Sequence, residues 1–323
     1  MPVLAPPPAP PALVRTVAAP PCDPAIRARA LAPARPGDDA VSLTCSLRLG
    51  PGDRVTRRIL LEGSRASGVT LDCDGATIGP GPGAGLLAFA VEVRSRPPAG
   101  RSGRWDRPED VTIQNCTILG HVRVWGMGLN GQGEAVRLSS HGPGHTERAQ
   151  DAAPARVTLR DSTITAFGHI PVYLGPGVTG FTLRDSRLDG RSESTAIYLD
   201  AESADNAILD NDIATATGRE IVAVDGSARN RITGNRVALG GRDGVHLYRN
   251  CGEGGTVRHQ TPSDNTVTGN TFRGGGFLGR PVVVNARGGW RLYCGQDAGY
   301  PFGSSIDDAD NATGNTVEPN RTE

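Results

Sequence analysis

Short apolar segments alternate with polar turns along most of the chain, and residues 195–250 give the clearest copy of this pattern. There, apolar runs such as TAIYLDA and REIVAVDG are separated by Gly-rich breaks and by Asn at regular intervals. Alternation of apolar and polar residues over a short run is typical of a strand with one buried face. Repetition of such a unit at a fixed period is typical of a solenoid, in which each repeat buries its apolar face against the next.

The repeat can be counted from a polar residue followed two positions later by a large apolar one. The first members of these pairs are Cys116, Ser162, Ser186, Asn211, Asn235, Asn270 and Asn315. Their spacings are 46, 24, 25, 24, 35 and 45 residues, which fit a base period of about 24 with three long inserts. The β-branched strands favour a parallel β-helix, and the L-x-x-L-x-L frame of leucine-rich repeats is missing.

The repeated Asn residues are predicted to be scaffold. An Asn at the same turn of every coil can hydrogen-bond the coils above and below, which satisfies backbone groups that a tight bend leaves unpaired. The residues assigned to this role are Asn206, Asn211, Asn230, Asn235, Asn265 and Asn270.

The fold class is therefore all-β: one right-handed parallel β-helix of about 24 residues per coil, with long loop insertions and an N-terminal arm and cap. We expect a Pro/Ala-rich arm over 1–21, a cap with a short helix over 22–40, the parallel β-helix over 41–317 and a tail over 318–323. The cap would cover the exposed first coil, as solenoids require.

Several segments resemble the secreted right-handed parallel β-helix superfamily of pectate-lyase-like proteins. They are LDCDGATI (71–78), VTLRDSTI (157–164) and the series DNAILDND, RNRITGNRV and DNTVTGNTF. The resemblance covers roughly residues 41–317 and implies the fold. It implies an activity only as a class, because that superfamily includes lyases, epimerases, hydrolases and adhesin-like proteins.

One strand of each coil is predicted to carry chemistry on its outward face. We align the strands at 135–140, 171–176, 196–201, 222–227, 245–250 and 282–287. Outward side chains then form two columns, and the residues between them (Leu138, Leu174, Leu199, Val224 and Leu247) point inward. The first column is Arg137, Tyr173, Tyr198, Ala223, His246 and Val283 or Val284. The second is Ser139, Gly175, Asp200, Asp225, Tyr248 and Asn285.

The first functional hypothesis is a lyase or C5-epimerase acting on a uronate-containing polysaccharide. Proton abstraction beside a carboxylate needs a base, an acid and a cation that stabilises the enolate-like intermediate. His246 would be the base, Tyr198 or Tyr248 the acid, and Arg249 or Arg137 the carboxylate clamp, with Tyr173 beside them in the groove. Such sets resemble those of β-helix alginate epimerases and lyases.

The alternative is a glycoside hydrolase. Asp200 and Asp225 fall in one column on consecutive coils, so their carboxyls would lie about 5 Å apart, the separation typical of retaining enzymes. Glu202, Glu220 or Asp243 would supply a wider pair. We expect no required cofactor, although Asp200 and Asp225 also suit Ca²⁺. Without a metal, two such carboxylates are expected to share a proton.

The long inserts are predicted to form the sides of the groove. Trp125 and Trp290, with Trp105, lie outside the repeat, where indole rings either stack on sugars or cap small cores of the loops themselves. The loop at 249–262 brings Glu253, Arg258 and His259 beside the same groove. A third reading is a non-catalytic carbohydrate-binding β-helix that uses the same residues.

The cysteines and the net charge limit the compartments and the classes of partner to be considered. Six Cys, mostly in loops, favour an oxidising compartment, so we expect a secreted or periplasmic protein although no intact signal peptide is visible. Cys22–Cys45 and Cys251–Cys294 are the predicted disulfides, while Cys73 and Cys116 either pair or remain buried thiols.

The formal charge of zero gives no case for nucleic-acid binding, and all 34 basic residues are Arg. No apolar run is long enough to span a membrane, and we expect a monomer that binds a polysaccharide or oligosaccharide.

Overall fold

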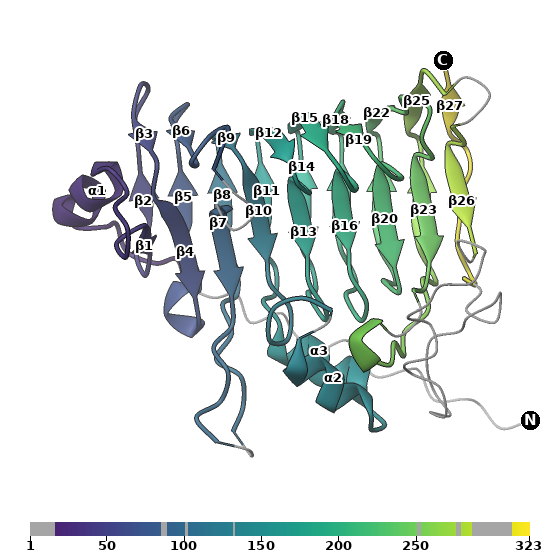
Figure 1. The fold of residues 1–323 in the computed structure, drawn as a ribbon, viewed down its shortest axis with the longest axis horizontal. Coiled ribbons are helices and arrows are strands. Elements are labelled where there is room, and N and C mark those ends of the chain that lie inside the picture. Colours follow the sequence, from purple (N-terminus) through teal and green to yellow (C-terminus); the bar gives the residue numbers. More distant parts are fainter. Residues whose placement is uncertain are drawn as a thin grey trace, which may run out of the picture.

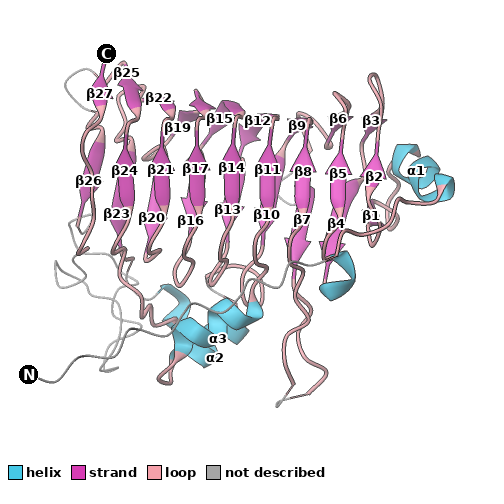
Figure 2. Cartoon of the chain, turned by 180° about the vertical axis from the view of Figure 1, so that it is seen from behind, coloured by secondary structure: helices cyan, strands magenta, loops and turns pink. Residues whose placement is uncertain are grey.

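Successive turns of the chain stack in a single row in the computed structural model, from the helix α1 (Pro24–Leu31) to the last strands (Figure 1). The structure describes residues 17–84, 89–100, 103–131, 133–250, 253–275, 279–285 and 312–323. Three sheets run along this row, and every strand pairing in them is parallel (Figure 2). The architecture is a parallel β-helix, as the repeat predicts.

Each coil contributes one short strand to each sheet. Sheet 1 contains β1 (Ala40–Ser42), β4 (Arg58–Glu62), β7 (Phe89–Arg94), β10 (His121–Val124), β13 (Val172–Leu174), β16 (Ile197–Leu199), β20 (Val222–Asp225), β23 (Val245–Tyr248) and β26 (Val282–Val284). Sheet 2 contains β2 (Leu47–Arg48), β5 (Thr70–Asp72), β8 (Thr112–Gln114), β11 (Thr158–Arg160), β14 (Thr182–Arg184), β17 (Ala207–Leu209), β21 (Arg231–Thr233) and β24 (Thr266–Thr268). Sheet 3 contains β3 (Arg54–Val55), β6 (Thr77–Ile78), β9 (Thr117–Leu119), β12 (Thr163–Gly168), β15 (Arg187–Ser192), β18 (Asp212–Ile213), β22 (Arg236–Ala238), β25 (Thr271–Arg273) and β27 (Arg321–Thr322), with β19 (Ala216–Thr217) beside β15.

The core is a set of apolar columns inside the three sheets. In sheet 1, the inward residues Leu174, Leu199, Val224 and Leu247 are in register on consecutive strands and all have no exposed surface. Each buried strand residue thus packs against its equivalent one coil away, at the strand spacing of about 4.8 Å. Burial of only a few apolar residues per strand in each coil explains why strands of two to six residues suffice.

The repeated Asn residues form two ladders of side chains buried in the turns. In the first, the Asn235 Oδ1 accepts from the backbone N–H of Asn211 at 3.0 Å and from its Nδ2 at 2.9 Å. The Asn235 Nδ2 then donates to the Oδ1 of Asn270 at 2.9 Å. The second ladder repeats this geometry through Asn206, Asn230, Asn265 and Asn315. The scaffold role predicted for these residues is confirmed.

The last step of the predicted repeat is wrong. Asn270 is followed in its ladder by Asn320, whose Oδ1 accepts from the Asn270 Nδ2 at 3.0 Å, and Asn315 belongs to the other ladder. The step is therefore 50 residues and not 45. Residues 318–323 were expected to form a tail. They instead contain strand β27, which pairs with β25 and completes this coil.

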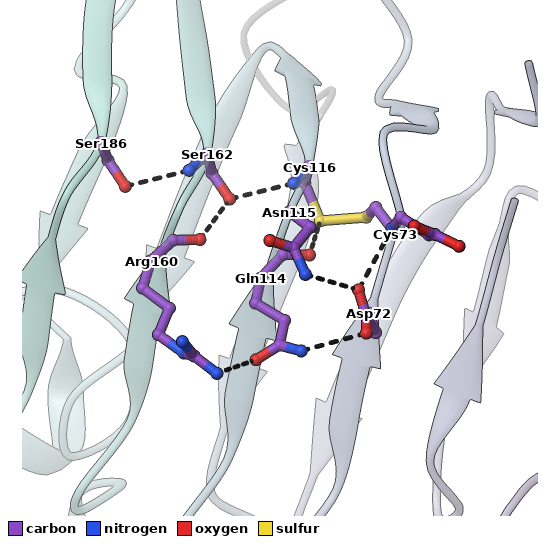
Figure 3. The surroundings of a disulfide bond; sticks show 9 residues. Asp72, Cys73, Gln114, Asn115, Cys116, Arg160, Ser162 and Ser186 are labelled. Atoms are coloured by element: carbon purple, nitrogen blue, oxygen red, sulfur yellow. Dashed lines mark hydrogen bonds between the residues drawn. A yellow bond between two sulfur atoms is a disulfide. The ribbon is translucent and has the colours of Figure 1, made fainter. Parts of the chain in front are cut away.

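The first ladder continues into Ser and Cys near the N-terminal end. The Ser186 Oγ accepts from Ser162 N, and the Ser162 Oγ accepts from Cys116 N at 3.1 Å (Figure 3). At the next coil a disulfide joins Cys116 to Cys73 and replaces the hydrogen bond. Of the two expectations for these residues, pairing is correct. The predicted Cys22–Cys45 disulfide is also present, whereas Cys251 and Cys294 lie outside the described residues.

The first long insert is helical where a strand was predicted. Residues 135–140 belong to helix α2 (Glu134–Ser140), which is followed by α3 (His145–Ala152). Arg137 and Ser139 are thus not part of an outward column, and Leu138 is 58% exposed instead of buried in the core. Their alternation resembled a strand, but the helix packs Val136 with Met127 and Ala149 in a small core of its own. Two short 3₁₀ helices, η1 (Ser64–Ala66) and η2 (Glu253–Gly255), complete the elements.

Replacing Asn235 by Ala is expected to lower the free energy of unfolding by about 3 kcal/mol. The change leaves the buried backbone N–H of Asn211 without an acceptor, and each orphaned group costs about 1–3 kcal/mol. Urea denaturation of Asn235→Ala and of the exposed neighbour variant Arg236→Ala, which should change stability by less than about 0.5 kcal/mol, makes the comparison. Equal losses in the two variants would show that the ladder contributes nothing specific.

Candidate functional site

The outward side chains of sheet 1 form the two predicted columns, but the residue that precedes Tyr173 in the first column is not the predicted one. The first column is Arg123, Tyr173, Tyr198, Ala223, His246 and Val283, as the strand register shows. Arg123 therefore holds the position that the sequence alignment gave to Arg137, because β10 and not the 135–140 segment is the strand before β13. The guanidinium of Arg123 is buried and lies 5.7 Å from the ring centre of Tyr173.

The second column brings two carboxylates together on consecutive coils. Asp200 and Asp225 occupy equivalent positions, each immediately after or at the end of its strand. The hydroxyl of Tyr173 donates to the Oδ2 of Asp200 at 2.6 Å, and that of Tyr198 donates to the Oδ2 of Asp225 at 2.5 Å. Each Tyr thus bonds the Asp of the next coil.

Arg258 joins the two carboxylates. Its Nη1 donates to the Oδ1 of Asp200 at 2.8 Å and to the Oδ2 of Asp225 at 2.9 Å, and all three side chains are at least 95% buried. A metal ion or a shared proton was expected between these carboxylates, but the cation is a guanidinium. Among the described residues, no group of three or more His, Cys, Asp or Glu side chains could hold a metal ion. Arg258 was expected beside the groove, whereas its bridging role was not foreseen.

Burial dominates the titration of this cluster. It raises the pKa of the Asp225 carboxyl, and although Arg258 lowers that pKa, the nearby Asp200 raises it again. Burial, reinforced by Asp225, also holds the pKa of the Tyr198 hydroxyl well above its usual value. The Tyr198 hydroxyl is therefore a neutral hydrogen-bond donor, and the Asp225 carboxyl holds a proton more readily than an exposed Asp.

A pocket of about 240 Å³ opens over the cluster. It is smaller than the roughly 300–1,000 Å³ clefts that take drug-sized ligands, and suits a single small polar unit. Asp200 lines it, while Asp225 has no exposed surface and accepts a hydrogen bond from Tyr198. The full lining is Asn130, Gly131, Ile170, Tyr173, Ser194, Tyr198, Asp200, Arg219 and Arg258.

The loop after β10 closes one side of the pocket through a glycine. A Cβ atom on Gly131 would lie 2.8 Å from the Oδ2 of Asp200 and 3.2 Å from the Nη2 of Arg258. Real Cβ atoms do not approach an atom to 2.8 Å, so a larger residue at this position would displace the backbone or the buried Asp200 carboxylate.

The segment that carries Arg258 is fixed by Glu202. The buried Glu202 carboxylate accepts from the backbone N–H of His259 at 2.7 Å and from the hydroxyl of Thr146 on α3 at 2.5 Å. The neighbouring Val257 N–H donates to the Oγ of Ser140 at the end of α2. In both views α2 and α3 lie together beyond the carboxyl ends of the sheet 1 strands (Figures 1 and 2). Glu202 therefore positions Arg258 through its backbone, and it does not line the pocket.

Two further residues predicted in the site lie one coil beyond the pocket. The hydroxyl of Tyr248 accepts from the Nη2 of Arg219 at 2.9 Å and donates to Glu220 at 3.1 Å, so Arg219 connects Tyr248 to the pocket. His246 lies with its ring centre 4.9 Å from that of Tyr248, and its Nε2 is 3.2 Å from the carbonyl oxygen of Asn285. Neither His246 nor Tyr248 lines the pocket.

The remaining predicted residues are more scattered. Arg249 donates to the carbonyl oxygens of Arg258 and His259, and the His259 Nε2 lies 2.8 Å from the carbonyl oxygen of Ser140, so both hold the loop. Trp125 lines a neighbouring pocket. Trp290 lies outside the described residues, and Glu253 begins η2. Arg219 and Asn130 were missed, because neither stands in a repeated position that alignment of coils could detect.

Comparison with known proteins matches residues 104–290 to a family described as the right handed beta helix region. No curated protein gives a match. Among solved structures, the surface protein and adhesin PfbA of Streptococcus pneumoniae is 15% identical with a TM-score of 0.40, covering 77% of this chain, and the chain spans 62% of its length. A mutant of DFA-IIIase from Arthrobacter chlorophenolicus A6 is 12% identical with a TM-score of 0.41, over 93% of this chain and 78% of that one. The enzymatically active domain of bacteriophage CBA120 tailspike protein 2 is 13% identical with a TM-score of 0.39, over 88% and 42%. These likenesses concern the fold alone.

Replacing Arg258 by Met is expected to cost about 3–5 kcal/mol of stability at pH 7, because it leaves two buried carboxylates without their cation. Without Arg258 the folded-state pKa of Asp225 rises further above the unfolded value of about 3.9. Stability is then lost as the pH rises through the folded pKa, so the cost should shrink toward pH 4. Denaturation of Arg258→Met across this pH range gives the measurement.

The double variant Asp225→Asn/Arg258→Met provides the control for that result. It removes the surplus buried charge and should recover part of the loss at pH 7. A loss that is independent of pH, and that Asp225→Asn leaves unchanged, would mean that Arg258 acts only through packing.

Proposed function

The chain belongs to the right-handed β-helix family, and on that premise we propose that it is a glycan-cleaving enzyme, a glycoside hydrolase with its active site at the pocket over Asp200 and Tyr198. The observation that carries the proposal is that two carboxylates of one cluster lie in different surroundings, one at the pocket and one buried behind it. Asp200 lines the pocket, whereas Asp225 is fully buried and is connected to it through two lining residues, the hydroxyl of Tyr198 and the guanidinium of Arg258. Glycoside hydrolysis requires such a pair, one group that holds a proton and one that is ionised.

The proposed step uses Tyr198 as the link between Asp225 and the substrate. In this step a protonated Asp225, a state that burial favours by raising its pKa, donates to the Tyr198 hydroxyl and so reverses the hydrogen bond seen in the structure. The Tyr198 hydroxyl gives its own proton to the leaving glycosidic oxygen and takes the proton of Asp225. Water attacks the anomeric carbon as the bond to the leaving oxygen breaks, and Asp200 takes the proton of that water. One water molecule is consumed, and solvent restores the proton from Asp200 to Asp225.

The charges in the pocket support hydrolysis above a reaction on a uronate. Arg258 pairs with Asp200 and Asp225, and Arg219 pairs with Glu220 at 2.8 Å. Among the described residues that line the pocket, no guanidinium is left uncompensated to bind a substrate carboxylate. A developing oxocarbenium ion, in contrast, is stabilised by the Asp200 carboxylate.

A uronate lyase or C5-epimerase is the second candidate, and the proximity of His246 to Tyr248 favours it. In that reaction His246 would remove the proton, Tyr248 or Tyr198 would return it, and Arg249 would hold the substrate carboxylate. It ranks second because neither His246 nor Tyr248 lines the pocket. Binding of a glycan without turnover is the remaining alternative.

We also propose that the protein works outside the cytoplasm, in a secreted or periplasmic location. Two disulfides, Cys22–Cys45 and Cys73–Cys116, support this, because such bonds persist in oxidising compartments. In the described part of the chain, no helix is long and apolar enough to cross a membrane.

Asp200→Asn and Tyr198→Phe are each expected to reduce glycan cleavage at least about 100-fold, because the first removes the proposed base and the second removes the hydroxyl that passes the proton to the leaving oxygen. Release of reducing ends from a panel of neutral and uronate polysaccharides measures the activity. The exposed pair of Asp205 with Arg229, neither of which lines the pocket, gives the matched control Asp205→Asn, which should keep full activity. Full activity in both site variants would exclude this pocket.

His246→Ala separates the two candidate reactions. Under hydrolysis at the pocket it should change kcat/KM less than about tenfold, since His246 does not touch the pocket. Under the lyase or epimerase reaction it should abolish turnover, because the base is lost. The absorbance at about 235 nm that unsaturated uronate ends produce is measured in parallel, and its appearance would favour the second candidate.

A further inference from the structure

A second pocket lies on the outer face of sheet 1 beside the first. Its volume is about 440 Å³, and it is lined by Glu62, Arg94, Ser95, Pro97, Trp105, Trp125, Gly126, Gly128, Leu129, Glu134 and Ala135. Two indole rings and Leu129, which is 49% exposed, give it an apolar surface. The hydrolase proposal makes no use of this pocket.

We propose that the pocket between Trp105 and Trp125 is a binding subsite for a neighbouring sugar of the same glycan, and that this glycan is uncharged. This inference rests on the proposed function, since it takes the pocket over Asp200 as the place of cleavage. Flat indole surfaces bind the apolar face of a pyranose ring by stacking.

One loop contributes to both pockets. Gly126, Gly128 and Leu129 line the subsite, and Asn130 and Gly131, the next two residues of the same loop, line the cleavage pocket. The aromatic rings also form one row, since Trp125 lies 5.7 Å from Tyr173, and Tyr173 lies 5.8 Å from Tyr198, centre to centre. The strands that carry the ends of this row are two spacings apart, or about 10 Å. That distance is comparable to the length of a disaccharide.

One buried hydroxyl in the subsite lacks a hydrogen-bond partner in the described part of the chain. Ser95 is 92% buried and lines the pocket, yet its Oγ makes no hydrogen bond to any residue that the structure describes. A buried hydroxyl without a partner costs free energy, so a ligand hydroxyl is a suitable partner. This observation points to a polar ligand with its own hydroxyl groups and not to an apolar one.

The charges of the subsite favour an uncharged sugar. The Glu62 carboxylate accepts from Arg94 at 2.6 Å and from Arg96 at 2.9 Å, so the Arg94 guanidinium is already paired. Glu134 adds a further negative charge at the rim. Among the described residues that line the two pockets, no guanidinium is therefore left uncompensated to bind a uronate carboxylate, whereas an uncharged sugar needs none.

Trp105 also packs against the small core of Met127 and Val136, as the alternative for the loop aromatics expected. The ring remains partly exposed and lines the subsite, so it can do both. A test must accordingly separate stacking from folding.

Binding is measured with Asp200→Asn, which retains substrate without cleaving it, on an array of neutral and uronate-containing oligosaccharides of graded length. Adding Trp105→Ala should weaken binding of neutral oligosaccharides that span both pockets about fivefold to tenfold. Binding of monosaccharides should be unchanged. Trp105→Phe should recover most of the loss, and Leu138→Ala, at an exposed position on α2 outside the pocket, should have no effect.

The outcomes separate the two proposals. If wild-type protein cleaves a neutral glycan while Trp105→Ala leaves the dependence on chain length intact, the subsite is wrong and the hydrolase stands. If Trp105→Ala weakens binding but no glycan is cleaved, the subsite stands and the hydrolase is wrong. Preference for uronate oligosaccharides, or equal losses in Trp105→Ala and Leu138→Ala, would overturn the subsite, and so would the absence of any binding.

Discussion

In-register stacking of coils is the constraint on which the rest of this structure depends. It places equivalent residues of successive coils next to one another, about 4.8 Å apart, whatever their chemistry. For apolar residues this produces the core columns, and for Asn it produces two ladders in which each amide satisfies the next turn. Where the ladder changes from Asn to Ser and then to Cys, the disulfide Cys73–Cys116 joins the next pair of coils (Figure 3).

The same constraint creates the cluster at the candidate site. Stacking of Asp200 on Asp225 places two carboxylates side by side under a loop, and burial of both is unfavourable unless a cation accompanies them. The coils themselves do not supply this cation. It comes from Arg258 in a long insert, which Glu202 and α2 hold against the sheet. The scaffold thus fixes the spacing of the acidic groups, and the inserts supply their countercharge and close the pocket.

The regular coils could be predicted from the sequence, because the residue type at each position can be compared with those at the equivalent positions of neighbouring repeats. The columns that contain Tyr173, Tyr198, Asp200 and Asp225 were found in this way. The inserts have no equivalents, so their structure could not be inferred from the period. The segment at 135–140 alternates like a strand yet forms α2, because its apolar residues pack with Met127 and α3 and not with a neighbouring coil. The bridging role of Arg258 and the contribution of Arg219 depend on where loops fold back, which no local pattern encodes.

The central claim is that the protein hydrolyses a glycan at the pocket over Asp200 and Tyr198. Mass spectrometry of the products formed from neutral and uronate-containing oligosaccharides in ¹⁸O-labelled water tests it most directly. The account predicts products of a neutral glycan in which one ¹⁸O atom from water is present at the newly formed end. Unsaturated products that contain no added water, released from a uronate-containing glycan, would contradict it.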